Sequence, residues 1–348
     1  MAKKLSKGST VALILLLILV VTGAITIPKL YKKFLKPNTN VEQKTYLYIP
    51  TGATYQQVQD SVTKNHLLID SSTFYDLAED RAYSSKIKPG KYPLEKGMNN
   101  RQILNMLIAG NQEAVQISFR NVRLKANFAA TVAKKLEFDS LSLINLLDSA
   151  DYVKTFGFNT DNIYTMFIPN SYEMYWNTSA SAFFERMNKE YKKFWNAERL
   201  QKAGALNLSP QEVTILASIV DSEALMDKEM PTIAGLYLNR LNRGIKLEAD
   251  PTVIFANNDF TIRRVLNRHL SKQSPYNTYV NKGLPPGPIT MPSINAIDAV
   301  LNPEKHNYIY MCAKEDFSGY HNFASTLSEH LANARRFQQA LNKRNIKK

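Results

Sequence analysis

The sequence predicts an α+β protein in three parts: an N-terminal transmembrane helix, a small α/β module, and a larger, mixed, helix-rich domain. Three observations carry this prediction. Residues 9–27 form an uncharged apolar run, strand and helix periodicities alternate over residues 45–114, and helical spacing dominates much of residues 115–348. A chain of 348 residues is long enough for two soluble domains beside an anchor.

The composition is that of a globular protein with a strong positive charge. A hydrophobic content of 44% with 21% charged residues argues against bulk disorder. The net charge of +14 fits nucleic acid, an anionic membrane surface, an acidic polymer, or simply a basic soluble surface. No arginine-aromatic run and no zinc-finger spacing occurs, so we expect no nucleic-acid partner. Cys312 is the only cysteine, which excludes an intramolecular disulfide and a cysteine metal cluster.

The N-terminal apolar run predicts the compartment. Residues 9–27 are 19 uncharged residues, and at about 1.5 Å per residue they nearly span a hydrocarbon core of about 30 Å. The three lysines within residues 1–8 favour a cytoplasmic tail. A cleaved signal peptide is the alternative, but no small-x-small site followed by an acidic or neutral stretch ends the run. We therefore expect an uncleaved anchor, a polar linker at 28–44, and the remaining chain outside the cytoplasm.

The module at 45–114 combines short strands and helices. "TYLYIP" alternates like a strand, and the next segment places Val58 and Val62 at helical spacing. A second helix is expected over "SSTFYDLAEDRAYS", with Ser71 or Ser72 as its cap. A further short strand and a helix ended by Gly110 complete the module. Such a unit is typical of a small binding module.

Two segments of the larger domain are rich in aromatic residues and turn formers. "FIPNSYEMYWNTSA" at 167–180 either packs beneath the body of the domain or lines a groove for a flat ligand such as a sugar ring. "SPYNTYVNKGLPPGPI" at 274–289 predicts rigid loops whose amides could bind sugar hydroxyls, with an ordinary turn region as the alternative.

The segment "SPQEVTILASIVDSEA" has a clear helix start. Ser209 is the expected N-cap, Pro210 the first helical residue, and Glu212 completes a capping box. Counting 100° per residue separates two acids that are two positions apart. Glu223 falls on the apolar face, and Asp221 falls on the polar side. The apolar arc of about 120° holds Val213, Leu216, Ile219 and Val220, and the polar side holds Thr214 and Ser218.

The predicted place of Glu223 has a chemical consequence. A carboxyl among apolar side chains loses hydration, which raises its pKa and suits it to act as a general acid near neutral pH. The alternative is that the helix ends by Glu223 and leaves the carboxyl at a frayed, solvated terminus.

The chain after this helix holds further polar candidates. "MPTIAGLYLNRLNRG" predicts a helix that starts near Pro231, carries Asn239 and Arg240, and is capped by Gly244. A polar turn is expected at Asp250-Pro251-Thr252. His321 follows in "GYHNFASTLSEH"; taken alone, such a histidine is more often structural than catalytic.

Six motifs in order resemble the YceG-like endolytic murein transglycosylases (MltG). They are "LASIVDSEA", "GLYLNRL", "KLEADPTVIFA", "SPYNTY", "GLPPGPI" and "HNFASTLSEH", and with "FIPNSYEMYW" the resemblance covers roughly residues 165–330. Together they are highly specific. "GATYQQVQDSV" and "KPGKYPLEKGMNNRQILNMLIAGNQ" also resemble the LysM-like module of that family. The resemblance implies a LysM-like module at 45–114 and a catalytic transglycosylase domain at 115–348.

The resemblance also implies the site. The family's pattern A-S-I-(I/V)-E-x-E carries its catalytic acid at the second glutamate, which is Glu223 here, and Asp221 replaces the first. Tyr172 matches the tyrosine of F-x-P-(D/N)-T-Y and is expected beside that acid. Candidates for sugar binding or support are Asn239, Arg240, Asp250, Thr252, Tyr276, Asn277, Thr278 and His321. Arg240 could equally be a buried ion-pair partner, and Glu173 or Asp250 would be the second carboxylate of a hydrolase.

The activity implied is cleavage of peptidoglycan between N-acetylmuramic acid and N-acetylglucosamine, with 1,6-anhydro ends and without metal or cofactor. The implied setting is the outer side of the cytoplasmic (inner) membrane, with glycan strands and peptidoglycan synthases as partners. Two other classes stay open: a hydrolytic glycosidase, and a non-catalytic wall-binding scaffold.

Overall fold

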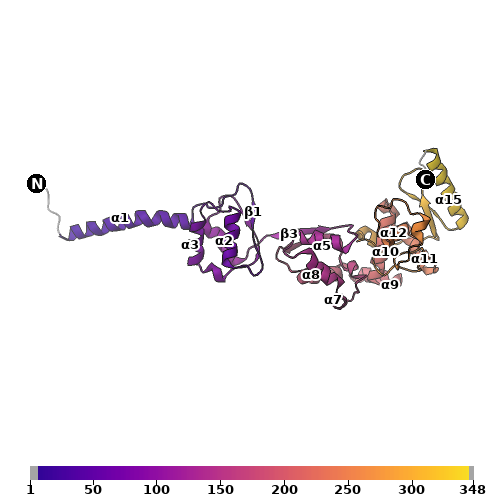
Figure 1. Ribbon diagram of the computed structural model, residues 1–348, viewed down its shortest axis with the longest axis horizontal. Coiled ribbons are helices and arrows are strands. Elements are labelled where there is room, and N and C mark those ends of the chain that lie inside the picture. Colours follow the sequence, from indigo (N-terminus) through magenta and orange to yellow (C-terminus); the bar gives the residue numbers. More distant parts are fainter. Residues whose placement is uncertain (1–6, 345–348) are drawn as a thin grey trace. The chain divides into compact units, whose positions relative to one another are not determined.

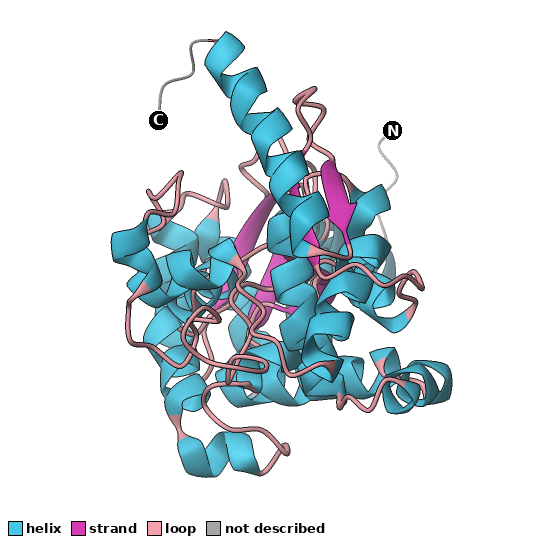
Figure 2. Cartoon of the chain, turned by 90° about the vertical axis from the view of Figure 1, so that its right-hand side faces the viewer, coloured by secondary structure: helices cyan, strands magenta, loops and turns pink. Residues whose placement is uncertain are grey.

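The protein, described here by a computed structural model, has defined structure over residues 7–344 and separates into two units. The first unit holds the chain up to residue 115 together with 173–178, and the second holds 116–172 and the chain from 179 onward. Residues 173–178 lie within the range predicted for the second domain, yet they belong to the first unit. Figure 1 labels the elements, and Figure 2 shows that helices predominate over short strands.

The first unit has the predicted order of strand, two helices and strand. Its elements are α1 (Lys7–Phe34), β1 (Thr45–Ile49), α2 (Tyr55–Lys64), α3 (Ser71–Asp80), β2 (Gly90–Leu94) and α4 (Asn100–Ala109). Strands β1 and β2 pair antiparallel, with Thr45 opposite Leu94. The cap of α3 is Asp70 and not Ser71 or Ser72, because the Asp70 carboxylate accepts the N–H of Thr73. The LysM-like character of this unit stays a prediction.

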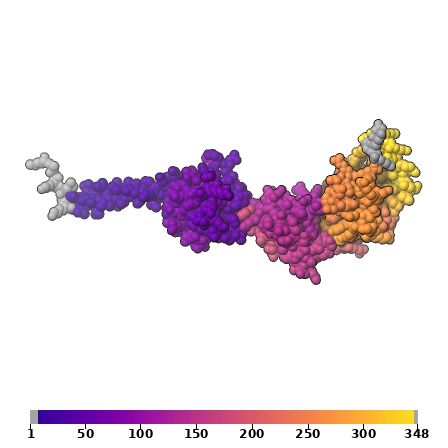
Figure 3. All heavy atoms as spheres, in the orientation of Figure 1, coloured from indigo at the N-terminus to yellow at the C-terminus, as the bar shows by residue number. Residues whose placement is uncertain are grey.

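Helix α1 is long and apolar enough to cross a membrane. Its most apolar window has a mean hydropathy of 2.8, and none of that window is buried by the protein. Figure 3 shows this part of the helix uncovered by other segments. The helix does not end near Ile27 as predicted but continues through Pro28 to Phe34. Proline removes one backbone donor without stopping the helix here, so the first part of the predicted linker is helical.

The segment that follows α1 is built into the first unit. Asn38 and Thr39 are buried. The Asn38 amide donates to Asn100 Oδ1 at 2.6 Å and to the Asp70 carbonyl at 2.8 Å, and its oxygen accepts the Asp70 N–H at 2.7 Å. Asn100 donates in turn to the carbonyl of Lys33 in α1 at 3.2 Å. Buried amides must be hydrogen-bonded, so this network fixes the predicted linker instead of leaving it loose.

Strands β3 (Ala114–Phe119) and β4 (Asn170–Tyr175) pair in a two-stranded sheet. Both strands pass from one unit to the other along the chain. The middle of the aromatic segment at 167–180 is therefore strand β4, with irregular chain on both sides of it. Phe167 and Tyr172 are buried, and the Trp176 ring meets Tyr48 edge-on at 5.0 Å within the first unit. For Phe167 and Tyr172 the packing alternative is confirmed, whereas Trp176 is only half-buried.

The second unit is mostly helical. Its helices are α5 (Lys125–Ala133), α6 (Ser140–Asp148), α7 (Ala150–Lys154), α8 (Ala180–Phe194), α9 (Ala197–Ala205), α10 (Pro210–Glu223), α11 (Met230–Asn242), α12 (Asp250–Asn257), α13 (Asn267–Leu270), α14 (Ile294–Leu301) and α15 (Leu327–Lys343). Strands β5 (Tyr310–Ala313) and β6 (His321–Ala324) pair antiparallel and pack against α15.

Helix α10 is the central helix of this unit. The predicted capping box is confirmed: Ser209 Oγ accepts the Glu212 N–H at 3.2 Å, and the Glu212 carboxylate accepts the Ser209 N–H at 2.8 Å. The predicted polar side is wrong, because every residue from 213 to 220 is buried. Thr214 and Ser218 satisfy their hydroxyls on carbonyls of their own helix, at 2.9 and 2.7 Å. Packing against α11, α12 and α14 encloses α10 all round.

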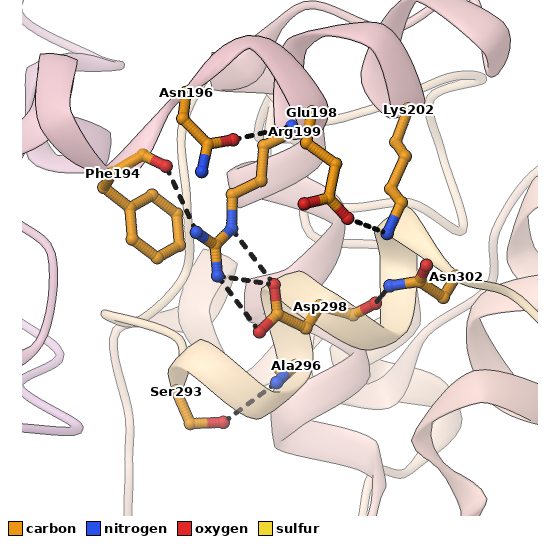
Figure 4. Close-up of polar contacts among 9 residues, drawn as sticks. All are labelled: Phe194, Asn196, Glu198, Arg199, Lys202, Ser293, Ala296, Asp298 and Asn302. Carbon is orange, nitrogen blue, oxygen red and sulfur yellow. Dashed lines mark hydrogen bonds and ion pairs between the residues drawn. The ribbon is translucent and has the colours of Figure 1, made fainter.

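An arginine–aspartate pair ties α9 to α14. Figure 4 shows Arg199 donating to both carboxylate oxygens of Asp298, at 3.1 and 3.3 Å from Nη2. The Arg199 guanidinium also lies over the Phe194 ring. This pair holds α14, whose N-cap Ser293 reaches the end of α10.

Candidate active site

A cavity of about 490 Å³ opens at the C-terminal end of α10. Its polar lining residues are Glu223, Tyr237, Arg240, Glu248, Asp250, Tyr279, Tyr310, His321 and His330. They come from α10, α11, α12, β5, β6, α15, the loop before α12 that carries Glu248, and the loop that carries Tyr279. Segments almost 110 residues apart in the chain therefore converge on Glu223.

Glu223 is the last residue of α10, but its carboxyl is not at a solvated terminus. The side chain is packed by protein and only partly exposed to solvent. The Tyr237 hydroxyl donates to Glu223 Oε1 at 2.9 Å. Burial raises the pKa of Glu223 to about 7, with a further contribution from the charge of Asp250, while hydrogen bonds from Tyr237 and the Asp250 backbone oppose the shift. The carboxyl is therefore substantially protonated near neutral pH.

Tyr237 is the closest partner of Glu223 that sequence reasoning missed. It is buried on α11, and burial with the neighbouring Glu223 raises its pKa well above the ordinary value. Its phenol consequently stays a donor. The available signal was a tyrosine on the buried face of a helix, because a buried phenol needs a hydrogen-bond partner.

Asp250 lies in the same cavity as Glu223. The predicted polar turn at 250–252 is wrong, because Asp250 begins α12 and Pro251 occupies its first turn, where proline is tolerated. The Asp250 carboxylate accepts a hydrogen bond from the Tyr279 hydroxyl at 2.7 Å. Tyr279 belongs to "SPYNTY", yet it was not selected from the sequence.

Arg240 is buried in the wall of the cavity. It donates to the carbonyls of Lys246 at 2.7 Å and Ile309 at 2.8 Å, and pairs with the Glu248 carboxylate. These contacts fit the ion-pair alternative for Arg240. They brace the loop before α12 against the strand that carries Tyr310.

Several predicted residues lie behind the cavity and bond to protein. The hydroxyls of Thr252 and Thr278 meet at 2.7 Å, and Thr278 accepts the N–H of Ala249 at 3.0 Å. The Asn277 amide donates to the carbonyls of Leu270, at the end of α13, and Lys272. The Asn239 amide donates to the carbonyls of His306 and Tyr308. Tyr276 packs on Phe255 with ring centroids 4.7 Å apart. These five side chains shape the loops that present the cavity.

Tyr172 and Glu173 are not among the residues that line this cavity. Tyr172 is buried, donates to the Ile168 carbonyl at 2.6 Å, and stacks on Phe119. Glu173 is exposed and belongs to the first unit.

Asp221 faces a different cavity from Glu223. It lines a hollow of about 240 Å³ together with Ser222, Arg123 and Thr290. Its carboxylate accepts the Ser293 hydroxyl at 2.5 Å, and burial raises its pKa above the ordinary value. The carboxylate thus joins α10 to the start of α14.

His321 is held at the edge of the main cavity. Its ring Nδ1 lies 2.9 Å from Glu229 Oε2, and its backbone N–H donates to Glu229 Oε1 at 2.8 Å. Within residues 7–344, no three His, Cys, Asp or Glu side chains gather as a metal site would require.

The geometry defines a site for acid–base chemistry: a packed carboxyl with a raised pKa, one fixed hydrogen-bond donor, and an open cavity beside it. The comparison of sequences agrees with the motifs. The YceG-like family matches residues 47–336, and the chain belongs to this family.

Two similar proteins are both named endolytic murein transglycosylase. The chain is 28% identical over 322 residues to an endolytic murein transglycosylase of Bacillus subtilis, covering 86% of this chain and 87% of that protein. An endolytic murein transglycosylase of Streptococcus pneumoniae is 25% identical over 79% of this chain, which spans 55% of that longer protein. The fold is similar to a crystal structure of a YceG-like protein from Listeria monocytogenes, with a TM-score of 0.54, 23% identity, and 84% and 99% of the two chains covered.

Proposed function

We propose that this chain is a membrane-anchored endolytic transglycosylase of peptidoglycan, with Glu223 as its acid and base. The observation that carries the proposal is the carboxyl of Glu223, whose pKa burial raises to about 7, beside an open cavity. The names of the relatives in Bacillus subtilis and Streptococcus pneumoniae supply the substrate class.

The reaction needs one carboxyl that first gives and then takes a proton. Protonated Glu223 donates to the glycosidic oxygen as the bond to muramyl C1 breaks through an oxocarbenium-like state. The resulting carboxylate accepts the proton of the C6 hydroxyl, whose oxygen closes the 1,6-anhydro ring on C1. A pKa near 7 suits both steps, because neither protonation state is strongly disfavoured. Tyr237 binds Oε1 throughout and fixes the orientation of the carboxyl.

Helix α1 supports the proposed location. Its length and hydropathy suit a single membrane crossing, and the lysines near its end suit contact with anionic headgroups. We infer that the second unit works outside the cytoplasm, on glycan strands near the membrane, where cleavage within new strands limits their length. Peptidoglycan synthases are the expected neighbours.

The test uses the full chain in detergent with purified peptidoglycan, beside Glu223→Gln. Mass spectrometry of the released glycans should show internal fragments with 1,6-anhydromuramic ends from the unaltered chain only. If neither chain releases products, the result favours the alternative that the protein is a non-catalytic wall-binding scaffold.

A hydrolase remains the second candidate because Asp250 shares the cavity with Glu223. Hydrolysis would give reducing ends in place of anhydro ends. The same mass spectra separate the two reactions, and an Asp250→Asn chain would then show whether the second carboxylate is required.

A further inference from the structure

The Glu229–His321 pair borders the same cavity, and the reaction described above makes no use of it. Glu229 is buried at the end of the short turn Asp227–Glu229 that precedes α11. Both of its carboxylate oxygens are occupied by His321, one by the backbone N–H and one by ring Nδ1. A buried carboxylate that holds one histidine at two points fixes the position and rotation of the ring.

A second histidine shows what is unusual about His321. In His306, Nε2 lies 2.9 Å from the Thr232 carbonyl and Nδ1 accepts the Tyr308 N–H at 3.1 Å. Both ring nitrogens of His306 are therefore engaged by backbone, and the residue does not line the cavity. His321 lines the cavity, and its Nε2 makes no hydrogen bond within residues 7–344.

The chemistry of the partner determines which nitrogen carries the proton. An ionised carboxylate only accepts hydrogen bonds, so a neutral His321 must carry its proton on Nδ1. The lone pair of Nε2 is then available on the side of the ring away from Glu229. Amino sugars present hydroxyl and acetamido N–H groups, which are donors that match this lone pair.

We propose that Glu229 holds His321 as the Nδ1–H tautomer so that Nε2 accepts a hydrogen bond from a hydroxyl or amide group of the amino sugar beside Glu223. Glu229 is then a positioning residue, and His321 is a substrate-contacting residue. The proposal rests on the proposed function for its choice of ligand. It assigns His321 a role in orienting the glycan and leaves the proton transfer to Glu223.

The decisive variant is Glu229→Gln. The glutamine oxygen can still accept the His321 backbone N–H, which turns the amide NH₂ towards Nδ1 and moves the ring proton to Nε2. A protonated Nε2 can no longer accept a hydrogen bond from the hydroxyl or amide N–H groups of the sugar. We expect kcat/KM for glycan cleavage to fall about 10- to 100-fold, because misplaced substrate loses orientation. His321→Ala should lower kcat/KM by a similar factor. His306→Gln is the matched control and should have the same kcat/KM as the unaltered chain.

Nitrogen-15 NMR of the histidine rings reads the tautomer directly. In the full chain in detergent, His321 should show a protonated Nδ1 and an unprotonated Nε2, and Glu229→Gln should exchange the two. Adding a GlcNAc–MurNAc oligosaccharide to Glu223→Gln should shift the Nε2 signal of His321 and leave His306 unchanged.

Three outcomes would overturn the proposal: an Nε2–H tautomer in the unaltered chain, a His321 signal that ignores saturating oligosaccharide, or full activity in His321→Ala. Failure of the proposed function would look different. The unaltered chain would then give no anhydro ends, while the oligosaccharide titration would still decide whether His321 contacts the sugar.

Discussion

The two acids at the end of α10 have different surroundings although only Ser222 separates them. Glu223 opens onto the large cavity and receives a hydrogen bond from Tyr237 on α11. Asp221 opens onto the smaller cavity and receives one from Ser293, which caps α14. Burial raises the pKa of both. The difference shows that a raised pKa alone does not define an acid catalyst: the partner that binds the carboxyl, and the cavity it faces, decide its use.

The largest expected effect separates the two acids by activity. Glu223→Gln removes the proposed proton donor and should lower the rate of glycan cleavage by about 10³-fold or more. Asp221→Asn leaves the cavity of Glu223 intact, and its rate should stay within about threefold of that of the unaltered chain. Rates of release of anhydro-ended fragments measure both. Equal losses of rate in the two variants would contradict this distinction between the acids, because Asp221 would then also take part in the reaction.

The pH profile tests the protonation of Glu223. Activity needs the protonated form, so the rate should fall as pH rises through about 7, and at pH 9 about 1% of the maximum should remain. A profile of kcat from pH 5 to 9 provides the measurement. A rate that is flat through pH 9 would contradict the assignment.

Stability at alkaline pH should rise when either acid is neutralised, and by more for Glu223 than for Asp221. The folded chain holds the proton of Glu223 to about pH 7, against an ordinary value of 4.5, so folding loses stability as pH rises between these values. Above pH 7, Glu223→Gln should therefore raise the free energy of unfolding by about 2 kcal/mol. Asp221→Asn should raise it by less, because burial also raises the pKa of Asp221 while its hydrogen bond with Ser293 opposes that shift. Denaturant unfolding at pH 8 tests both signs.

Tyr237→Phe should cost less activity than Glu223→Gln, and it refines the Glu223 side of the comparison. The change removes a hydrogen-bond donor that favours the ionised form of Glu223, so the pKa of Glu223 should rise. The alkaline limb of the pH–rate profile should therefore move to higher pH. The loss of orientation should reduce kcat about tenfold. A pH profile identical to that of the unaltered chain would show that the hydroxyl does not govern the carboxyl.

The sequence predicted what depends on near neighbours. The capping box at Ser209 uses residues three positions apart, and the structure contains it. The choice of Glu223 came from a helix phase and a family motif, although the polar side assumed for α10 does not exist. Enclosure by three helices cannot be read from the periodicity of one helix, because hydroxyl groups that bond to carbonyls of their own helix can be buried with their hydrogen bonds satisfied.

Partners from distant segments were beyond the sequence argument. Tyr237, Tyr279 and Glu229 were not selected as site residues from the sequence. Each acquires its role from a residue that lies 14, 29 or 92 positions away. Loop geometry likewise decides that Tyr172 bonds to Ile168 and stays out of the cavity.

The buried network around Asn38 affects how this protein could be shed from a cell. With α1 in the membrane, as proposed, no extended stretch separates the apolar helix from the folded first unit, since Asn38 and Thr39 are buried immediately after the helix. A protease needs several residues of extended, accessible backbone to cut. A cut at Asn38 or Thr39 would thus require the first unit to unfold locally, so that the resistance of this segment to release depends on the stability of that unit.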